Sequence, residues 1–466
     1  MERRFIDAID SEHPEYRGKK ALLKEYRDLY TGGEQIRGNA TDYLIRRQKE
    51  PAEVYQERLS RVFYENYIGS IIDWYVATLF RREPVVLTEG SDARGRQFIS
   101  RFTEDCDLRG TSLAEFYRKQ MLDALVCGSS HIVVDFPRAA QIPESLAEED
   151  RTGTGRAYLS ACSAENLINW NTDERGEFEW VVMRHEHIQK GSPAIPEWLK
   201  ETRWVYYDKE SFQVYRRVEG AGERGGVELV DEGTHGFARL GRVPVYSIRL
   251  PEGLWLMNKG GSVQLEHFNK SNALSWALTL GLFATPVIYS EREWNQIIGE
   301  SYYIQLGPQD RFGWTEPDGK VYQIASDNLT RLQEEIYRVC YLLHQSGGQA
   351  ARGVSASGAS KQRDFAITQE VLRNYGDVVK ESIKRILRGV VAVRQDALMV
   401  DVSGMDEFDI GDFSMELDDA QRLLGLGIKS ETLRKQVFKK LAFKYLCDVR
   451  QEVKEKIAGE IDQMEA

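Results

Sequence analysis

The chain has 466 residues, and 62 Lys or Arg residues against 73 Asp or Glu residues give it a net charge of −11. This length exceeds one ordinary core, so we expect two to four subdomains in a soluble, folded protein. The longest apolar runs, such as 274–284, fall short of the ~20 residues of a membrane span, and residues 1–5 lack the apolar core of a secretion signal, so we expect neither a membrane protein nor an exported one. The charge argues against broad, tight DNA binding but is compatible with a protein that surrounds DNA and lets it slide.

The five cysteines are widely spaced and form no CxxC pair, which argues against both a zinc knuckle and a disulfide framework. They are Cys106, Cys127, Cys162, Cys340 and Cys447. We therefore expect synthesis in a reducing compartment.

The N-terminal part predicts helices. Residues 15–30 have amphipathic spacing and stop at Gly32-Gly33, and Pro51 opens a second helix that we expect to continue to about Phe80. Ser112 and Glu115 form a capping box for a helix that reaches Cys127, where Gly128 is the natural stop. Residues 131–136 then predict a strand.

Between residues 156 and 250 the pattern changes to β. Alternating or Val/Tyr/Trp-rich segments occur at 157–161, 179–188, 203–207, 213–218, 227–230 and 245–248. Together with the helices, they predict an α+β fold with an antiparallel sheet.

The central part predicts a long helix, a small insertion, a second helix, a loop and a longer helix. Residues 263–283 have helical spacing with a second apolar stripe of Leu274, Leu278 and Leu282, so this helix should be contacted on two sides. The insertion, 291–324, contains expected short strands at 302–306 and 321–324. A helix over 326–345 precedes a Gly/Ser-rich segment at 346–358 that reads as a mobile loop. From residue 361 a helix of roughly thirty residues would span about 45 Å, and the tail from 413 is helical, with a new cap at Ser430.

Catalytic motifs are weak. Residues 33–38 have the glycine spacing of a phosphate loop but lack the Lys and Ser/Thr that must follow it. His185 and His187 would share one strand face, either as part of a zinc site or as two surface histidines. Residues 420–445 resemble a helix-turn-helix with a basic second helix, but Leu433, Val437, Leu441 and Tyr445 indicate an ordinary buried face. We predict no catalytic residues, metal or cofactor.

Several segments resemble tailed-bacteriophage portal proteins, the head–tail connectors. The likeness lies in 43–47 (YLIRR), 55–59 (YQERL), 72–74 (IDW), 79–84 (LFRREP) and the helix–Gly–strand unit at 127–135. The order of helix, αβ insertion, helix, loop and long helix is also similar to the family's stem, clip, stem, tunnel loop and long helix.

The resemblance implies a portal-type fold with these parts: a wing at 1–255, a first stem helix at 256–285, a clip at 286–325, a second stem helix at 326–345, a tunnel loop at 346–360, a long wing helix at 361–400 and C-terminal wing or crown helices at 401–466. It implies a homo-oligomeric ring, usually a dodecamer, at one capsid vertex of the virion, made in the host cytoplasm without a membrane. Such a ring nucleates capsid assembly, passes double-stranded DNA during packaging and ejection, and joins head to tail.

The implied partners are the terminase large subunit, the major capsid protein and scaffold, and a head-completion adaptor or tail protein. The implied DNA-channel residues are Gly347, Gly348, Arg352, Ser355, Ser357, Lys361 and Arg363. The implied clip contacts are Glu291, Arg292, Glu293, Trp294 and Arg311, with Trp294 and Trp314 either interface anchors or local packing. The alternatives are a virion assembly or scaffold protein without a DNA channel and a nucleic-acid enzyme.

Overall fold

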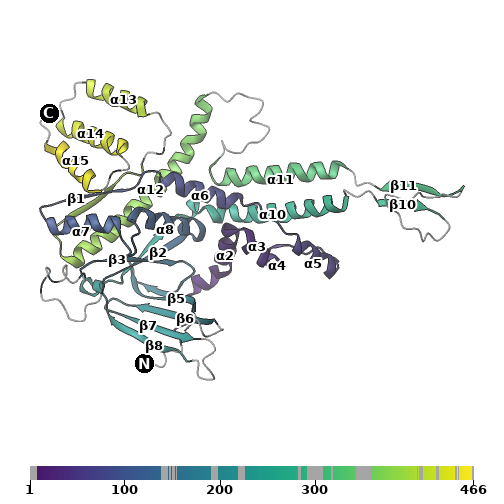
Figure 1. The fold of residues 1–466 in the computed structure, drawn as a ribbon, viewed down its shortest axis with the longest axis horizontal. Helices are drawn as coiled ribbons and strands as arrows, with labels where there is room; N and C mark the ends of the chain where they lie inside the picture. Colours follow the sequence, from purple (N-terminus) through teal and green to yellow (C-terminus); the bar gives the residue numbers. More distant parts are fainter. Residues whose placement is uncertain are drawn as a thin grey trace. The chain divides into compact units, whose positions relative to one another are not determined.

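The computed structural model describes residues 8–137, 145, 148, 153, 155–189, 198–218, 226–281, 285–290, 308–315, 319–342, 358–406, 408, 413–426, 430–446, 449 and 451–463. Long helices and antiparallel sheets make up this part of the chain, so the predicted α+β class is confirmed (Figure 1). Two compact units divide the chain: the first comprises 1–27, 70–259 and 357–466, and the second comprises 28–69 and 260–356. Among the described helices, none combines the length and apolarity that crossing a bilayer requires.

The first unit contains two larger antiparallel sheets. One has the order β3-β2-β9, from β2 (Ser129–Asp135), β3 (Tyr158–Ser163) and β9 (Val245–Arg249). The other is a meander of β4 (Leu167–Thr172), β5 (Phe178–Gln189), β6 (Leu199–Tyr207), β7 (Ser211–Val218) and β8 (Glu228–Thr234). Our expectation of one sheet from 156–250 was wrong, because spacing along the chain predicts strands but not their partners. We also did not predict β4, whose pairing with β5 contains register shifts.

Both faces of the five-stranded sheet are covered. Successive side chains of β5 point to opposite faces, so Val181 and Met183 join one core cluster and Val182 joins another. The first cluster also contains Val133, Cys162 and Val245 of the three-stranded sheet. The second contains Ile9, Tyr16, Ile168, Trp204 and Tyr215. The N-terminal residues therefore complete the core on one face of the five-stranded sheet.

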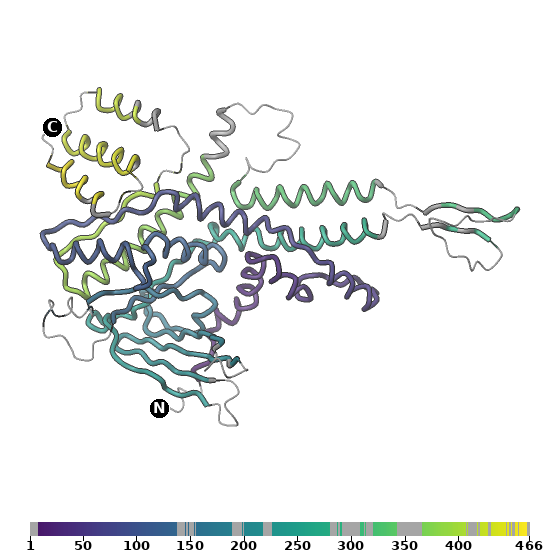
Figure 2. Tube along the Cα trace, viewed as in Figure 1, coloured from purple at the N-terminus to yellow at the C-terminus, as the bar shows by residue number. Residues whose placement is uncertain are grey.

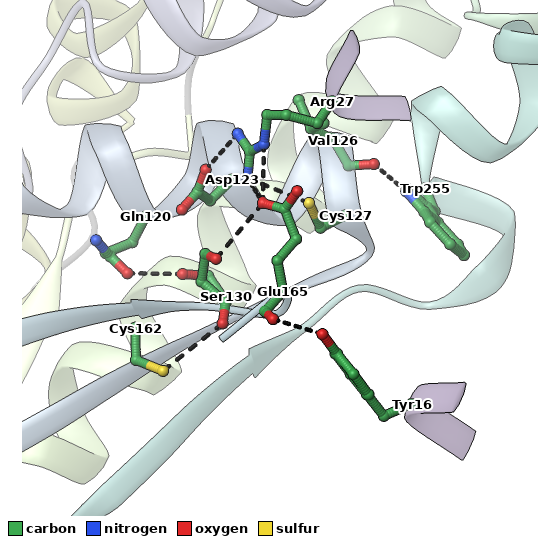
Figure 3. A network of polar contacts seen from close by, with 11 residues as sticks. Tyr16, Arg27, Gln120, Asp123, Val126, Cys127, Ser130, Cys162, Glu165 and Trp255 are labelled. Atoms are coloured by element: carbon green, nitrogen blue, oxygen red, sulfur yellow. Dashed lines mark hydrogen bonds and ion pairs between the residues drawn. The ribbon is translucent and has the colours of Figure 1, made fainter. Parts of the chain in front are cut away.

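Helix α2 (Pro14–Thr31), close to the predicted 15–30, is joined to the sheets by a polar network around Arg27 (Figure 3). The guanidinium of Arg27 lies 2.8 Å from an oxygen of Asp123 and 2.8 Å from one of Glu165, and it also donates to the Cys127 sulfur. The Tyr16 hydroxyl donates to the backbone oxygen of Glu165 at 2.8 Å. One arginine thus connects α2 to helix α8 (Leu113–Cys127) and to the turn before β4.

Helix α8 (Leu113–Cys127) begins and ends as the sequence predicts. The Ser112 hydroxyl accepts a hydrogen bond from the Glu115 N–H at 3.2 Å, and Gly128 follows the helix in the left-handed conformation, with φ of 80°. A β-carbon at Gly128 would lie 2.9 Å from the ring of Trp255. Glycine is required here by both its backbone angle and the packed indole.

The first unit also contains α7 (Ala93–Glu104), the 37-residue α12 (Gly358–Arg394), and a small sheet of β1 (Val85–Glu89) and β12 (Met399–Ser403). Nearly every residue that we assigned to the apolar face of α12 is buried. These are Leu372, Tyr375, Val379, Ile383, Ile386, Val390 and Val393. Phe365 was assigned to the same face, but nothing is described of its side chain.

Three short helices form the C-terminal part of the first unit: α13 (Phe413–Gly425), α14 (Glu431–Tyr445) and α15 (Gln451–Gln463) (Figure 2). The Ser430 hydroxyl accepts a hydrogen bond from the Leu433 N–H at 3.2 Å, which confirms the predicted cap.

The second unit contains α3 (Gly33–Gly38), α4 (Ala40–Tyr43), α5 (Ala52–Ser60), the hairpin of β10 (Thr285–Tyr289) and β11 (Arg311–Thr315), and α11 (Gly319–Val339). Helices α6 (Tyr67–Leu79) and α10 (Leu256–Gly281) each begin in one unit and end in the other.

Two predictions in this unit were wrong. The helix expected from Pro51 to Phe80 is interrupted, because the Asn66 side chain accepts a hydrogen bond from the Gly69 N–H at 2.9 Å and caps a new helix, α6. The strand expected at 321–324 is part of α11, where the Tyr322 hydroxyl donates to the Ala277 carbonyl of α10. Packing against α10 overrides the local β preference of Val, Tyr and Ile.

Candidate functional site

Helices α10 and α11 form an antiparallel pair in the second unit (Figure 2). The Lys270 ammonium donates to the Asn328 side chain at 3.3 Å, and the Tyr322 hydroxyl donates to the Ala277 carbonyl at 3.3 Å. At the other end, a β-carbon on Gly260 would lie 3.4 Å from the sulfur of Cys340. As the residue number rises along α10, the number of the facing residue falls, so the two helices are antiparallel. Helix α10 leads to the hairpin, and α11 leads away from it.

Three amide side chains of α10 hold irregular backbone of the same unit. Gln264 donates to the carbonyl of Glu65 at 2.7 Å, and Asn272 donates to the carbonyl of Phe63 at 3.0 Å while accepting from its N–H. Asn269 makes the same kind of paired contact: it donates to the carbonyl of Tyr43 at 3.0 Å and accepts from the N–H of Ile45. These bonds satisfy backbone groups that have no strand or helix partner.

The sequence did not reveal this anchoring role. We assigned Asn272 to the continuous helical face, and it is buried there, but its contacts are polar rather than apolar. The sequence does contain a signal for this role: Gln264 and Asn272 lie about two turns apart on an otherwise apolar face, and buried amides require hydrogen-bond partners.

A buried ion pair stabilises the neighbouring α5. The Arg58 guanidinium donates to both carboxylate oxygens of Glu50, at 2.9 and 2.8 Å. Burial tends to raise the pKa of Glu50, but the N–H of Arg47 and the guanidinium of Arg58 together outweigh it. The pKa of Glu50 is consequently lowered from its ordinary value, and the carboxylate is held in its charged form.

The two helices bury one side and expose the other. On α11, Leu332 and Ile336 are buried, and so is Cys340 directly after the helix, as the predicted apolar face requires. Val321 and Ile324, one turn apart on α11, are 63% and 69% exposed. Leu278 of the predicted second stripe of α10 is 39% exposed, and Leu282 lies outside the described residues. The contact of this stripe with a neighbouring chain stays a prediction.

The hairpin occupies the region assigned to the clip. Its register pairs Thr285 with Thr315 and Tyr289 with Arg311, and Tyr289 is 66% exposed. Within the described residues, neither outer edge of this hairpin pairs with a further strand. Isolated two-stranded sheets are at best marginally stable, so these edges favour additional contacts.

Only one predicted clip contact is described in full. Arg311 begins β11 with an exposed side chain. Trp314 lies in β11 opposite Pro286, but nothing is described of its side chain. The remaining predicted clip residues, Glu291, Arg292, Glu293 and Trp294, lie outside the described residues.

The predicted DNA-channel residues lie at or before the start of α12. Helix α11 ends at Val339, Tyr341 has φ of 63°, and α12 begins at Gly358. Lys361 and Arg363 lie in the first two turns of α12, with only their backbone described. The other predicted channel residues, Gly347, Gly348, Arg352, Ser355 and Ser357, lie outside the described residues.

The histidine pair lies in the first unit, on β5. The rings of His185 and His187 are stacked with centroids 6.4 Å apart, beside an open pocket of about 600 Å³. Burial, and then the proximity of His187, lowers the pKa of His185. In the described part of the chain, no three His, Cys, Asp or Glu side chains come together in an arrangement that could hold a metal.

The two other motifs have clear structural positions. Residues 33–38 form helix α3 rather than a phosphate-binding loop. On α14, the prediction of an ordinary buried face was wrong: Tyr445 is 70% exposed, and Leu433, Val437 and Leu441 are only half-buried. Spacing identified the stripe, but within the described residues no element covers it fully.

No protein-family model matches this sequence, and no curated protein matches it. A search of solved structures does find matches to this chain. A chain from the neck of an empty GTA particle with C6 symmetry has a TM-score of 0.47 and 13% identity, over 80% of this chain and 90% of that chain. A chain from the virion of a native gene transfer agent (GTA) particle has a TM-score of 0.45 and 11% identity, over 79% and 89%. A chain from the neck of a native GTA particle with C12 symmetry has a TM-score of 0.40 and 11% identity, over 79% and 89%.

Proposed function

We propose that this chain is the subunit of a viral portal: a closed ring at one capsid vertex through which double-stranded DNA is packaged and later ejected, and which connects head to tail. The observation that carries the proposal is the order of elements, in which the antiparallel pair of α10 and α11 brackets a small hairpin and the 37-residue α12 follows. This order is similar to the stem, clip, stem and long helix of portal proteins.

The exposed apolar side chains of the helix pair support the ring. Val321 and Ile324 on α11 and Leu278 on α10 belong to the same unit and are exposed in the single chain. Large apolar side chains at regular helical positions favour coverage by another chain. In a head-to-tail ring every copy provides such coverage for the next one, and closure leaves no surface unpaired.

The proposed partners follow from the parts of the ring. The hairpin of β10 and β11, with exposed Tyr289 and Arg311, is the proposed contact for the terminase large subunit and later for the head-completion adaptor. The segment before α12 would project into the channel, with Arg352 and the flanking Lys361 and Arg363 of the first turns of α12 in transient, salt-dependent contact with DNA phosphate. An acidic chain, at net charge −11, suits a channel through which DNA must slide.

Electron microscopy and native mass spectrometry of the purified chain test the ring directly. We expect closed rings with a central hole and a mass that is a whole multiple of 53.5 kDa, with twelve copies as the proposed number. Monomers with nuclease or ATPase activity would support the nucleic-acid enzyme instead. Oligomers without a lumen would support the virion assembly or scaffold protein without a DNA channel.

Deletion of residues 347–358 tests the channel segment. We expect the deleted protein to form rings of the same subunit number, because the helix pair and the first unit keep their surfaces. Packaging or retention of DNA should be impaired, as measured by the nuclease-protected DNA of assembled capsids. Loss of ring formation would instead make the segment structural and contradict its assignment to the channel.

A further inference from the structure

An open cavity of about 500 Å³ lies in the first unit, among α2, β2, β4 and the segment before α10. Its walls are largely apolar and include two tryptophans. The wall residues are Leu22 and Leu23 of α2, Leu167 and Trp170 of β4, and Trp255. The volume falls within the usual range of ligand-binding pockets, which is roughly 300–1,000 Å³.

Both indoles are fixed by contacts with their own chain. The ring of Trp170 stacks on the ring of His13, with centroids 4.0 Å apart. The indole N–H of Trp255 donates to the carbonyl of Val126 at 2.9 Å (Figure 3), and its ring packs against Gly128. Aromatic walls that are already in position can bind a flat apolar group with little further loss of conformational entropy.

A buried imidazole supplies the cavity with a polar atom. His131 of β2 lines the cavity and is only 4% exposed. Its Nδ1 and the Ser247 hydroxyl are hydrogen-bonded at 2.8 Å, whereas its Nε2 has no hydrogen-bond partner within the described residues. Burial, and then the positive charge of Arg249, lowers the pKa of His131 to about 3, so the imidazole is neutral at neutral pH. A neutral ring nitrogen in an apolar pocket favours a ligand with an uncharged hydrogen-bonding group.

Four exposed charged side chains line the same cavity, and their charges balance. Lys19 and Arg249 are cationic, and Glu15 and Glu252 are anionic. None of the four forms an ion pair within the described part of the chain. These side chains suit a ligand that carries both signs of charge, as a polypeptide does.

We propose that this cavity binds an aromatic side chain, tryptophan or tyrosine, from a peptide segment of another protein. The aromatic ring packs against the apolar walls, and its N–H or O–H donates to Nε2 of His131, whose Nδ1 then donates to Ser247. Charged residues beside the aromatic one pair with the four charged side chains of the cavity. The proposal goes beyond the ring and does not depend on it, because every residue of the cavity belongs to the first unit.

Single-stranded nucleic acid is the other class of ligand that stacks on tryptophan. The cavity favours a peptide, because the carboxylates of Glu15 and Glu252 repel phosphate groups as strongly as Lys19 and Arg249 attract them. The net charge of −11 on the whole chain also opposes phosphate binding.

Isothermal titration calorimetry of the full chain with N-acetyl-L-tryptophanamide tests the site. We expect saturable binding with a dissociation constant of about 0.1–1 mM, which is typical of a ligand of this size. N-acetyl-L-leucinamide, and the benzothiophene analogue of the probe that lacks the indole N–H, should each bind about tenfold more weakly. Equal binding of the leucine compound would overturn the choice of an aromatic ligand, and equal binding of the benzothiophene would overturn the role of His131.

Two variants locate the binding in this cavity. Leu22→Asn makes one wall polar, and Ala164→Phe adds a ring at another lining residue. Each should weaken binding of the probe by about tenfold or more. The matched control is Leu87→Asn, at a half-buried leucine of β1 that does not line the cavity, and it should bind the probe like the wild type. Circular dichroism and thermal unfolding show whether each variant is folded.

The charged side chains have a test of their own. An acetylated Lys-Trp-Glu peptide amide should bind more tightly than the neutral probe at low salt, and high salt should reduce this difference. Equal affinities at every salt concentration would contradict a peptide ligand.

Three results overturn the site itself. The first is the absence of saturable binding of the probe up to about 10 mM. The second is unchanged binding in a folded Leu22→Asn or Ala164→Phe variant, which would place the probe elsewhere on the chain. The third is displacement of the probe by single-stranded oligothymidylate, which would assign the cavity to nucleic acid.

Discussion

Replacing Val321 and Ile324 of α11 with serine should weaken assembly without weakening the subunit. The two residues are 63% and 69% exposed in the single chain, so serine removes few contacts within it. Complete burial of such a side chain contributes roughly 1.5–3 kcal/mol, and about two thirds of that, about 1–2 kcal/mol per residue, is left for a neighbouring copy to supply. The double variant therefore loses about 2–4 kcal/mol per contact between copies, or about 100-fold in the association constant.

Sedimentation velocity over a range of subunit concentrations measures this loss. The concentration at which half of the subunits assemble should rise by about 100-fold or slightly more, because a closed head-to-tail ring contains one such contact per subunit. The matched control is Ile188→Ser on β5, where an isoleucine is 73% exposed in the other unit. Thermal unfolding of both variants under non-assembling conditions should match the wild type. Unchanged assembly of the Val321/Ile324 variant would refute the idea that this side of α11 faces a neighbour.

Three further predictions concern the subunit itself. Asn272→Ala on α10 removes two hydrogen bonds to the backbone of Phe63 and should lower the free energy of unfolding by about 1–3 kcal/mol in urea titrations. The control Ser275→Ala, at an exposed position of the same helix, should cost much less. The lowered pKa of Glu50 means that its ionised form stabilises the fold above its ordinary pKa of 4.5, and this contribution is lost as the pH falls below that value. Wild-type protein should therefore lose more stability than Glu50→Gln between pH 5 and pH 3; parallel curves of stability against pH would contradict the role of the ion pair. Arg27→Met should lower the free energy of unfolding by about 1–2 kcal/mol. This is less than the loss expected for a fully buried arginine, because a quarter of the side chain is exposed. An unchanged unfolding midpoint would show that the network in Figure 3 contributes no net stability.

Helix boundaries set by local chemistry were predictable. Ser112 and Gly128 bound α8 because a hydroxyl cap and a left-handed glycine act within a few residues of the helix end. The apolar face of α12 was equally predictable, since its 3.6-residue period persists over many turns. The expected strand at 321–324 failed for the opposite reason: its local β preference is weak compared with packing against α10.

The candidate site was predictable in outline and not in its contacts. Spacing gave the order of helix, insertion, helix and long helix, and the resemblance assigned Arg311 to the clip. Nothing local indicates that Gln264 and Asn272 bind the backbone of residues some 200 positions earlier, because that requires the two segments to be brought together. The same holds for the predicted buried face of α14, where Tyr445 is 70% exposed and the three aliphatic residues are only half-buried.

The sequence by itself determined the α+β class, most of the strands and helices, and the apolar faces of the long helices, because these depend on side-chain periodicity and caps within a few turns. Only the tertiary structure decided that the strands divide into two sheets, that α10 and α11 lie antiparallel, and which apolar stripes stay uncovered. Strand pairing and helix packing join residues far apart in the chain, and their free energy depends on which surfaces meet rather than on the pattern of either one.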